Sequence, residues 1–108
     1  MSASSSFTLD EWKGVSPPRA AEIMQMLSEQ GLSAYRWSNS PGDVYSAHSH
    51  SFHKIIYVLQ GSITFVLPLA EEQVTLNAGD RLELPPDTLH EAEVGPQGVI
   101  CLEAHNGT

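Results

Sequence analysis

Residues 48–61 have the sequence HSHSFHKIIYVLQG and contain three of the five histidines of the chain. The run Ile55–Leu59 is apolar and rich in β-branched residues, which favours a strand. Because side chains of a strand alternate between its two faces, His48 and His50 are expected on the same face. Two imidazoles on one face can bind one metal ion if a third ligand comes from another segment. His90 follows the turn sequence LPPDTL and is the candidate, so we predict a metal site formed by His48, His50 and His90.

The segments on both sides of this stretch predict short strands separated by glycine and proline turns. We expect strands at 32–37, 44–50, 55–59, 63–67, 74–76, 81–84, 91–94 and 99–104. We also expect tight turns at Gln60–Gly61 and at Gly95–Gly98, where glycine supplies the positive φ that such turns need. About eight short strands at regular spacing indicate an all-β sandwich or barrel.

One helix is predicted before the strands. Ser16 suits the N-cap position and Pro17 suits the first helical position. Apolar residues at helical spacing form one stripe that comprises Ala20, Ile23, Met24 and Leu27. Gly31 is expected to end the helix in the left-handed conformation. We therefore divide the chain into an N-terminal arm and helix, residues 1–31, that pack on a β-barrel domain, residues 32–105.

The composition argues against several classes of function. The 108 residues carry a formal net charge of −8 with only five lysines and arginines, which argues against nucleic acid and anionic membranes as partners. No apolar run approaches the ~18 residues that span a bilayer. Residues 1–6 lack the basic and apolar regions of a signal peptide, so we expect a cytoplasmic protein. Cys101 is the single cysteine and lies in an apolar run, where we expect a buried structural thiol.

The segment between residues 42 and 94 resembles the paired motifs of the cupin superfamily. The first motif comprises Gly42, His48, His50, Lys54 and Gly61, and the second comprises Gly79, Pro85, Asp87 and His90. With the flanking strands, the resemblance covers roughly residues 32–104. The resemblance implies an all-β fold, a small jelly-roll (cupin) barrel. The helical pattern that precedes residue 32 adds one N-terminal helix to this barrel.

The resemblance also implies a ligand set. His48, His50 and His90 match the three histidines with which members of the family hold a divalent transition metal (Fe, Mn, Ni or Zn), and many members form homodimers. The fourth ligand of the family is usually a glutamate, but Lys54 stands at that position. A protonated lysine cannot be a metal ligand because it has donors and no acceptor.

Lys54 leaves three interpretations open. In the first, three histidines hold the metal, as in some cupin dioxygenases, while Lys54 acts in catalysis as an acid or binds an anionic substrate. Phe52, which has the same parity as the ligands, would then line the pocket. In the second, a local bulge turns His53 into the pocket as a fourth ligand. In the third, Lys54 marks a weakened metal site in a barrel that only binds a small molecule.

These interpretations lead to different functions. The leading hypothesis is a single-domain metal-binding cupin with a three-His site that acts as a dioxygenase or a related small-molecule enzyme. The main alternative is a non-enzymatic cupin that binds or senses a small ligand through a weakened metal site. A third hypothesis is isomerisation or epimerisation without a cofactor, with a histidine of the barrel as general base.

Overall fold

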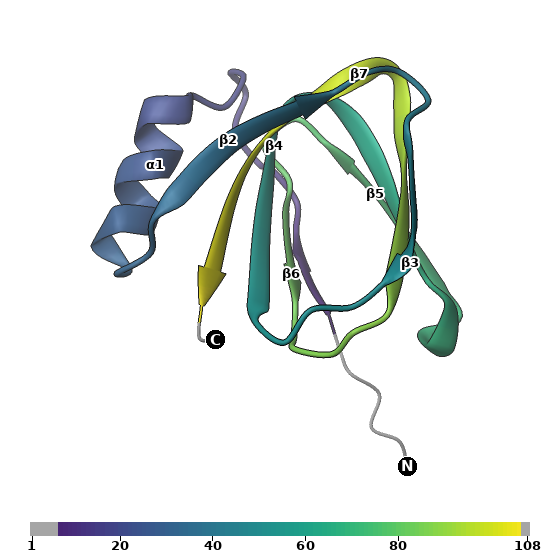
Figure 1. Cartoon of the computed structure of the whole chain (residues 1–108). Coiled ribbons are helices and arrows are strands. Elements are labelled where there is room, and N and C mark those ends of the chain that lie inside the picture. Colours follow the sequence, from purple (N-terminus) through teal and green to yellow (C-terminus); the bar gives the residue numbers. More distant parts are fainter. Residues whose placement is uncertain (1–6, 107–108) are drawn as a thin grey trace.

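The computed structural model describes residues 7–106, which form seven β-strands, one α-helix and a short 3-10 helix. The strands are β1 (Thr8–Asp10), β2 (Ala34–Asn39), β3 (Val44–His48), β4 (His53–Leu67), β5 (Glu72–Asn77), β6 (Arg81–Leu84) and β7 (His90–Asn106). The helix α1 spans Ala20–Glu29, and the 3-10 helix Pro68–Ala70 connects β4 to β5. Figure 1 shows that the strands enclose an interior and that α1 lies outside it.

Two long strands, β4 and β7, hold the barrel together. They pair antiparallel with each other along most of their lengths. The first half of β4 also pairs with β6, and its second half pairs with β5. Strand β7 pairs with β3 near its start and with β2 near its end, while β1 is added at the edge of β6. The predicted small jelly-roll barrel with one N-terminal helix is therefore confirmed, with seven strands in place of about eight (Figure 1).

Both long strands bend at glycine bulges that face each other. The register between β4 and β7 shifts on both sides of Gly61, which pairs with Val99. Gly61 and Gly98 have φ values of +77° and +78°. A Cβ atom on Gly61 would lie 2.0 Å from the carbonyl oxygen of Gly98. The turns predicted at Gln60–Gly61 and Gly95–Gly98 are therefore wrong, because glycine lets the two backbones bend and stay paired.

Each bulge reverses the parity of the residues that face the interior. On β4 the inner residues are Ile56 and Val58 before the bulge and Ile63, Phe65 and Leu67 after it; on β7 they change from Ala92 and Val94 to Val99 and Cys101. Cys101 is fully buried in this core. Burial raises the pKa of the Cys101 thiol to about 12, so the thiol stays protonated, as expected for a structural cysteine.

The helix α1 covers the outer face of the sheet where β4 and β7 pair. Ile23 and Leu27 are buried in a second apolar cluster that also contains Ile55, Tyr57, Leu59 and Leu102. The run Ile55–Leu59 is apolar without alternation because the barrel core covers one of its faces and α1 covers the other.

The start of α1 differs from the prediction. The helix begins at Ala20 with Arg19 as its N-cap, and no side chain of the described residues caps it. Pro18 keeps the residue before it out of the helical region, so a helix cannot start at Pro17. The carbonyl group of Ser16, the predicted cap, instead accepts a hydrogen bond from Trp12 Nε1 (2.9 Å).

The apolar stripe of α1 is narrower than predicted, and its end is as predicted. Ile23 and Leu27 face the sheet and are buried, whereas Met24 is 41% exposed. Gly31 adopts a φ of +80°, and the Leu32 N–H donates to the Leu27 carbonyl (2.9 Å), which closes the helix. This helix is too short to cross a membrane, and no other helix of the described residues could do so.

The described residues before α1 include a strand that the sequence did not predict. Residues 8–10 form β1, and Phe7 and Leu9 pack against the barrel core. The backbone N–H of Trp12 donates to Asp80 Oδ1 (2.8 Å), which fastens the segment to the turn before β6. The predicted boundary between residues 31 and 32 lies in the connection between α1 and β2. The expectation about a signal peptide concerns residues 1–6, which lie outside the described residues.

The contact between the two bulges predicts a steric effect on stability. We expect Gly61→Ala to lower the free energy of unfolding by at least ~2 kcal/mol, because the new Cβ clashes with the Gly98 carbonyl in addition to the strain of a positive φ. Denaturant unfolding measures this loss. Gly31→Ala is the control, because it has the same sign of φ and no described atom within 4 Å of its Cβ, so it should cost only roughly 1 kcal/mol. Equal losses in the two variants would contradict the steric explanation.

Candidate metal centre

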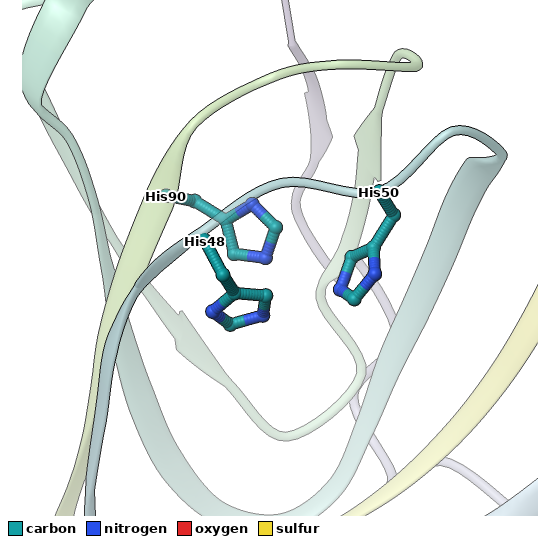
Figure 2. A group of neighbouring side chains, drawn as sticks. All are labelled: His48, His50 and His90. Atoms are coloured by element: carbon teal, nitrogen blue, oxygen red, sulfur yellow. The ribbon is translucent and has the colours of Figure 1, made fainter.

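Three histidines from two segments of the chain converge in the barrel (Figure 2). His48 is the last residue of β3 and pairs directly with His90, the first residue of β7. His50 lies in the connection between β3 and β4, and its carbonyl accepts a hydrogen bond from the Asp87 N–H (2.6 Å). One ring nitrogen from each histidine lies within 4.8 Å of the other two. This spacing allows one ion to contact all three imidazoles.

Backbone carbonyls fix the tautomers of two of these rings. His48 Nδ1 donates to the Ser46 carbonyl (2.7 Å), and His90 Nδ1 donates to the Thr88 carbonyl (2.9 Å). Because a carbonyl only accepts, the proton is on Nδ1 and the lone pair is on Nε2. Among the described residues, the Nε2 atoms of His50 and His90 are buried without a hydrogen-bond partner. Buried polar atoms without partners are uncommon, and three imidazole lone pairs facing one point fit a transition metal ion.

The environment keeps two of the imidazoles neutral. Burial lowers the pKa of His90 to about 4, although the hydrogen bond to the Thr88 carbonyl acts in the opposite direction. The Lys54 charge and the neighbouring imidazoles lower this pKa further. Burial, followed by the Lys54 charge, also lowers the pKa of His50. Neutral imidazole is the form that binds a metal, so both rings are ready to act as ligands at neutral pH.

The three histidines line a cavity of about 470 Å³ inside the barrel. Apolar side chains that include Phe52, Ile56, Ile63 and Phe65 contribute to its lining. A further part of the lining is polar, and we refer to it as the Glu103 cluster: Tyr35, Trp37, Lys54, Glu103 and His105. A cavity of this volume suits a small molecule of at most about two dozen non-hydrogen atoms.

The Glu103 carboxylate is the centre of this cluster. Oε1 accepts a hydrogen bond from Trp37 Nε1 (2.9 Å), and Oε2 accepts hydrogen bonds from Tyr35 (2.8 Å) and His105 Nε2 (2.6 Å). The Lys54 Nζ lies 3.6 Å from Oε2. Burial alone would raise the pKa of Glu103, but the Lys54 charge and the three hydrogen bonds outweigh it and lower the pKa. Glu103 is therefore a buried, ionised carboxylate.

Phe52 connects the histidines to the Glu103 cluster. Its ring stacks on His50 at 4.7 Å between centroids and on His105 at 3.9 Å. The structure thus places Phe52 in the cavity lining, where the sequence parity put it. Lys54 also lines the cavity, with a side chain that is 14% exposed.

His53, the other residue predicted to line the pocket, lies elsewhere. Its Nε2 is 2.8 Å from Glu83 Oε1, and Glu83 also binds Arg81. The prediction that His53 lines the pocket is wrong, because β4 begins in regular pairing and no bulge turns this residue inward.

Sequence reasoning missed Glu103 and His105. Counting alternate residues from His90 along one continuous strand puts both on the outer face. The bulge at Gly98 reverses the parity, so that Glu103 and His105 face the cavity. The segment Gly95–Gly98 is the sequence signal for this change of face. It can be interpreted as a turn between two strands or as a bulge within one strand, and only the bulge puts Glu103 and His105 in the cavity.

The comparison with protein families agrees with this geometry. The model of the AraC-like ligand binding domain matches residues 30–103. The chain belongs to this family and to the cupin superfamily. Acireductone dioxygenase 1 of Pectobacterium atrosepticum is 27% identical over an alignment of 116 positions, gaps included, that covers 86% of this chain and 67% of the relative.

Solved structures of other cupin-like proteins are similar to this chain. An RmlC-like cupin from Shewanella frigidimarina matches with a TM-score of 0.59 and 26% identity, over 68% of this chain and 64% of that one. The polyketide cyclase RemF from Streptomyces resistomycificus matches with a TM-score of 0.61 and 28% identity, over 68% of this chain and 54% of that one. These similar proteins include enzymes that catalyse different reactions. The similarity therefore supports the barrel and its cavity, and it does not single out one reaction.

The lowered pKa of His90 predicts a loss of stability in mild acid for chelator-treated protein. Below pH 6.5 the unfolded chain takes up a proton that the folded state resists down to about pH 4. The free energy of unfolding should therefore fall across this range by up to about 3 kcal/mol. Denaturant unfolding between about pH 7 and pH 5 avoids the titration of the carboxylates. His90→Asn keeps a donor for the Thr88 carbonyl and removes the titrating nitrogen, so its pH slope should be smaller; an unchanged slope would refute this explanation.

Proposed function

We propose that this cupin holds one divalent transition metal (Fe, Mn, Ni or Zn) with His48, His50 and His90 and acts on a small molecule as a dioxygenase or a related enzyme. The observation that carries the proposal is the convergence of three imidazoles within 4.8 Å, with two buried Nε2 atoms that lack a partner among the described residues. The similarity to an acireductone dioxygenase supports the reaction class.

The residues around the site have distinct tasks in this proposal. When bound, the metal would supply Lewis acidity, and Fe or Mn would also supply the one-electron chemistry of oxygenation. The Ser46 and Thr88 carbonyls hold two ligand rings in the required tautomer. Phe52 and Phe65 keep the region apolar and limit the access of water.

Lys54 is the residue that we assign to the substrate. The distance of 3.6 Å from Nζ to Glu103 is longer than a normal hydrogen bond, so its N–H groups remain available to a ligand. A partly buried ammonium group in a small cavity favours an anionic or enolic oxygen. The proposed substrate is therefore a small molecule with at least one such group.

Binding of a ligand without turnover is the second candidate function. The family to which the chain belongs is described as a ligand binding domain. In that case Lys54 would weaken the metal site, and the cavity would serve as a sensor. We also propose a homodimer and a cytoplasmic location, which sedimentation analysis and cell fractionation would test.

The metal content tests the proposed site directly. Protein purified without chelator should contain about one transition metal ion per chain, measured by elemental analysis. His48→Asn and His90→Asn each keep the donor to the backbone carbonyl and should lose the metal with little change in the circular dichroism spectrum. His53→Asn is the control, because His53 lies outside the cavity, and it should retain the metal. Wild-type protein that stays metal-free after incubation with Fe, Mn, Ni and Zn would refute the proposal.

Oxygen uptake separates the enzyme from the sensor. The metal-loaded protein should consume O₂ with at least one compound from a panel of acireductones, 1,3-diketones and thiols, and His90→Asn should not. Calorimetry of the metal-free protein with the same panel gives the comparison. Ligand binding that is unaffected by removal of the metal, without oxygen uptake, would favour the sensor.

A further inference from the structure

The cavity combines a proposed cation site with a partly buried lysine. Of the described residues that line it, Lys54 is the only lysine or arginine and Glu103 is the only carboxylate. A fixed positive charge near a dication opposes metal binding, and the effect is larger inside a protein than in water. A site of this kind therefore needs a nearby negative charge that offsets the lysine.

Glu103 is positioned to provide that charge. Lys54 pairs with His105 and Ile56 pairs with Glu103 across β4 and β7, so Lys54 and Glu103 are diagonal neighbours on the inner face. The carboxylate is 4% exposed, so solvent screens the pair only weakly.

The rest of the cluster holds the carboxylate in place. The hydrogen bonds from Tyr35 and Trp37 tie it to β2, and the bond from His105 ties it to its own strand. Glu103 therefore cannot swing away from Lys54 without breaking three hydrogen bonds, including the one from the partly buried Trp37.

We propose that Glu103 is the positioning residue that makes the three-His site compatible with Lys54. Its carboxylate cancels the charge of the ammonium group and keeps that group within the Glu103 cluster, so that a dication binds as it would in a cavity without net charge. This inference rests on the proposed function, because it assumes that the three histidines bind a metal.

The proposal predicts an order of metal affinities that follows the net charge of the pair. Glu103→Gln leaves Lys54 unpaired, Lys54→Met leaves Glu103 unpaired, and the double variant has no charge at either position. We expect Lys54→Met to bind Ni²⁺ most tightly, wild type and the double variant to bind with equal affinity within about threefold, and Glu103→Gln to bind most weakly. A sphere of the cavity's volume is about 10 Å across, so one unit of charge should change the dissociation constant about tenfold or more.

Calorimetric or chelator-competition titration with Ni²⁺ measures these affinities without any substrate. Gln keeps the size and acceptor oxygen of Glu103, and thermal unfolding checks that each variant folds. If Glu103→Gln does not fold, the comparison of Lys54→Met with the double variant still measures the effect of the carboxylate. Glu83→Gln removes a carboxylate that binds His53 outside the cavity, so its affinity should match that of wild type.

The outcomes distinguish this inference from the proposed function. The expected order, with the double variant close to wild type, supports the role of Glu103. Equal affinities in all variants would overturn it while leaving the three-His site intact. An affinity in the double variant that is as weak as in Glu103→Gln, or weaker, would indicate a purely structural role and would also overturn it. Absence of Ni²⁺ binding in wild type would overturn both proposals.

Discussion

The close contact between the Gly61 and Gly98 bulges determines which side chains in the second halves of β4 and β7 point into the cavity. Strands β4 and β7 each belong to both halves of the barrel, and they can do so only because the two backbones bend together. The bend also shifts the parity of each strand by one residue. Phe65 before β5 and Glu103 near the end of β7 therefore face the same interior as Lys54 and His90. The chemistry of the cavity thus depends on a backbone contact that involves no functional side chain.

Local patterns in the sequence predicted the barrel and the histidines but not the bulges. Alternation predicted His48 and His50 on one face of a strand at 44–50, and the turn before His90 together with the cupin resemblance added the third histidine. The strand β3 ends at His48, so His50 reaches the site from the connection that follows it. The segment Gly95–Gly98 looks like a turn because glycine and proline break strands locally. Whether the strand continues is decided by its pairing with β4 and β2, which are far away in the sequence. Glu103 and His105 could not be assigned to the cavity until that pairing was known.

Burial has opposite consequences for the two kinds of ionisable group in the cavity. It favours the neutral form of His50 and His90, which is the form that binds a metal. It also penalises the charged form of Glu103, but the neighbouring Lys54 and the three hydrogen bonds that Glu103 accepts outweigh this penalty and lower its pKa. A buried ion pair of this kind adds little to the stability of a fold. Its presence is easier to explain by the ligands of the cavity than by the packing of the barrel.

The parts that hold the ligand rings are independent of the parts that shape the rest of the cavity. His48 and His90 are oriented by the carbonyls of Ser46 and Thr88, which belong to the backbone and do not change when cavity side chains change. The Glu103 cluster, in contrast, is made of side chains on β2, β4 and β7. The ligand geometry of this barrel can therefore stay the same while the rest of the lining varies. The fold alone does not fix a reaction, since this chain is similar both to an acireductone dioxygenase and to a polyketide cyclase. Under the proposed function, Lys54, Glu103 and their neighbours in the cavity lining would select the substrate, which the three histidines alone do not specify.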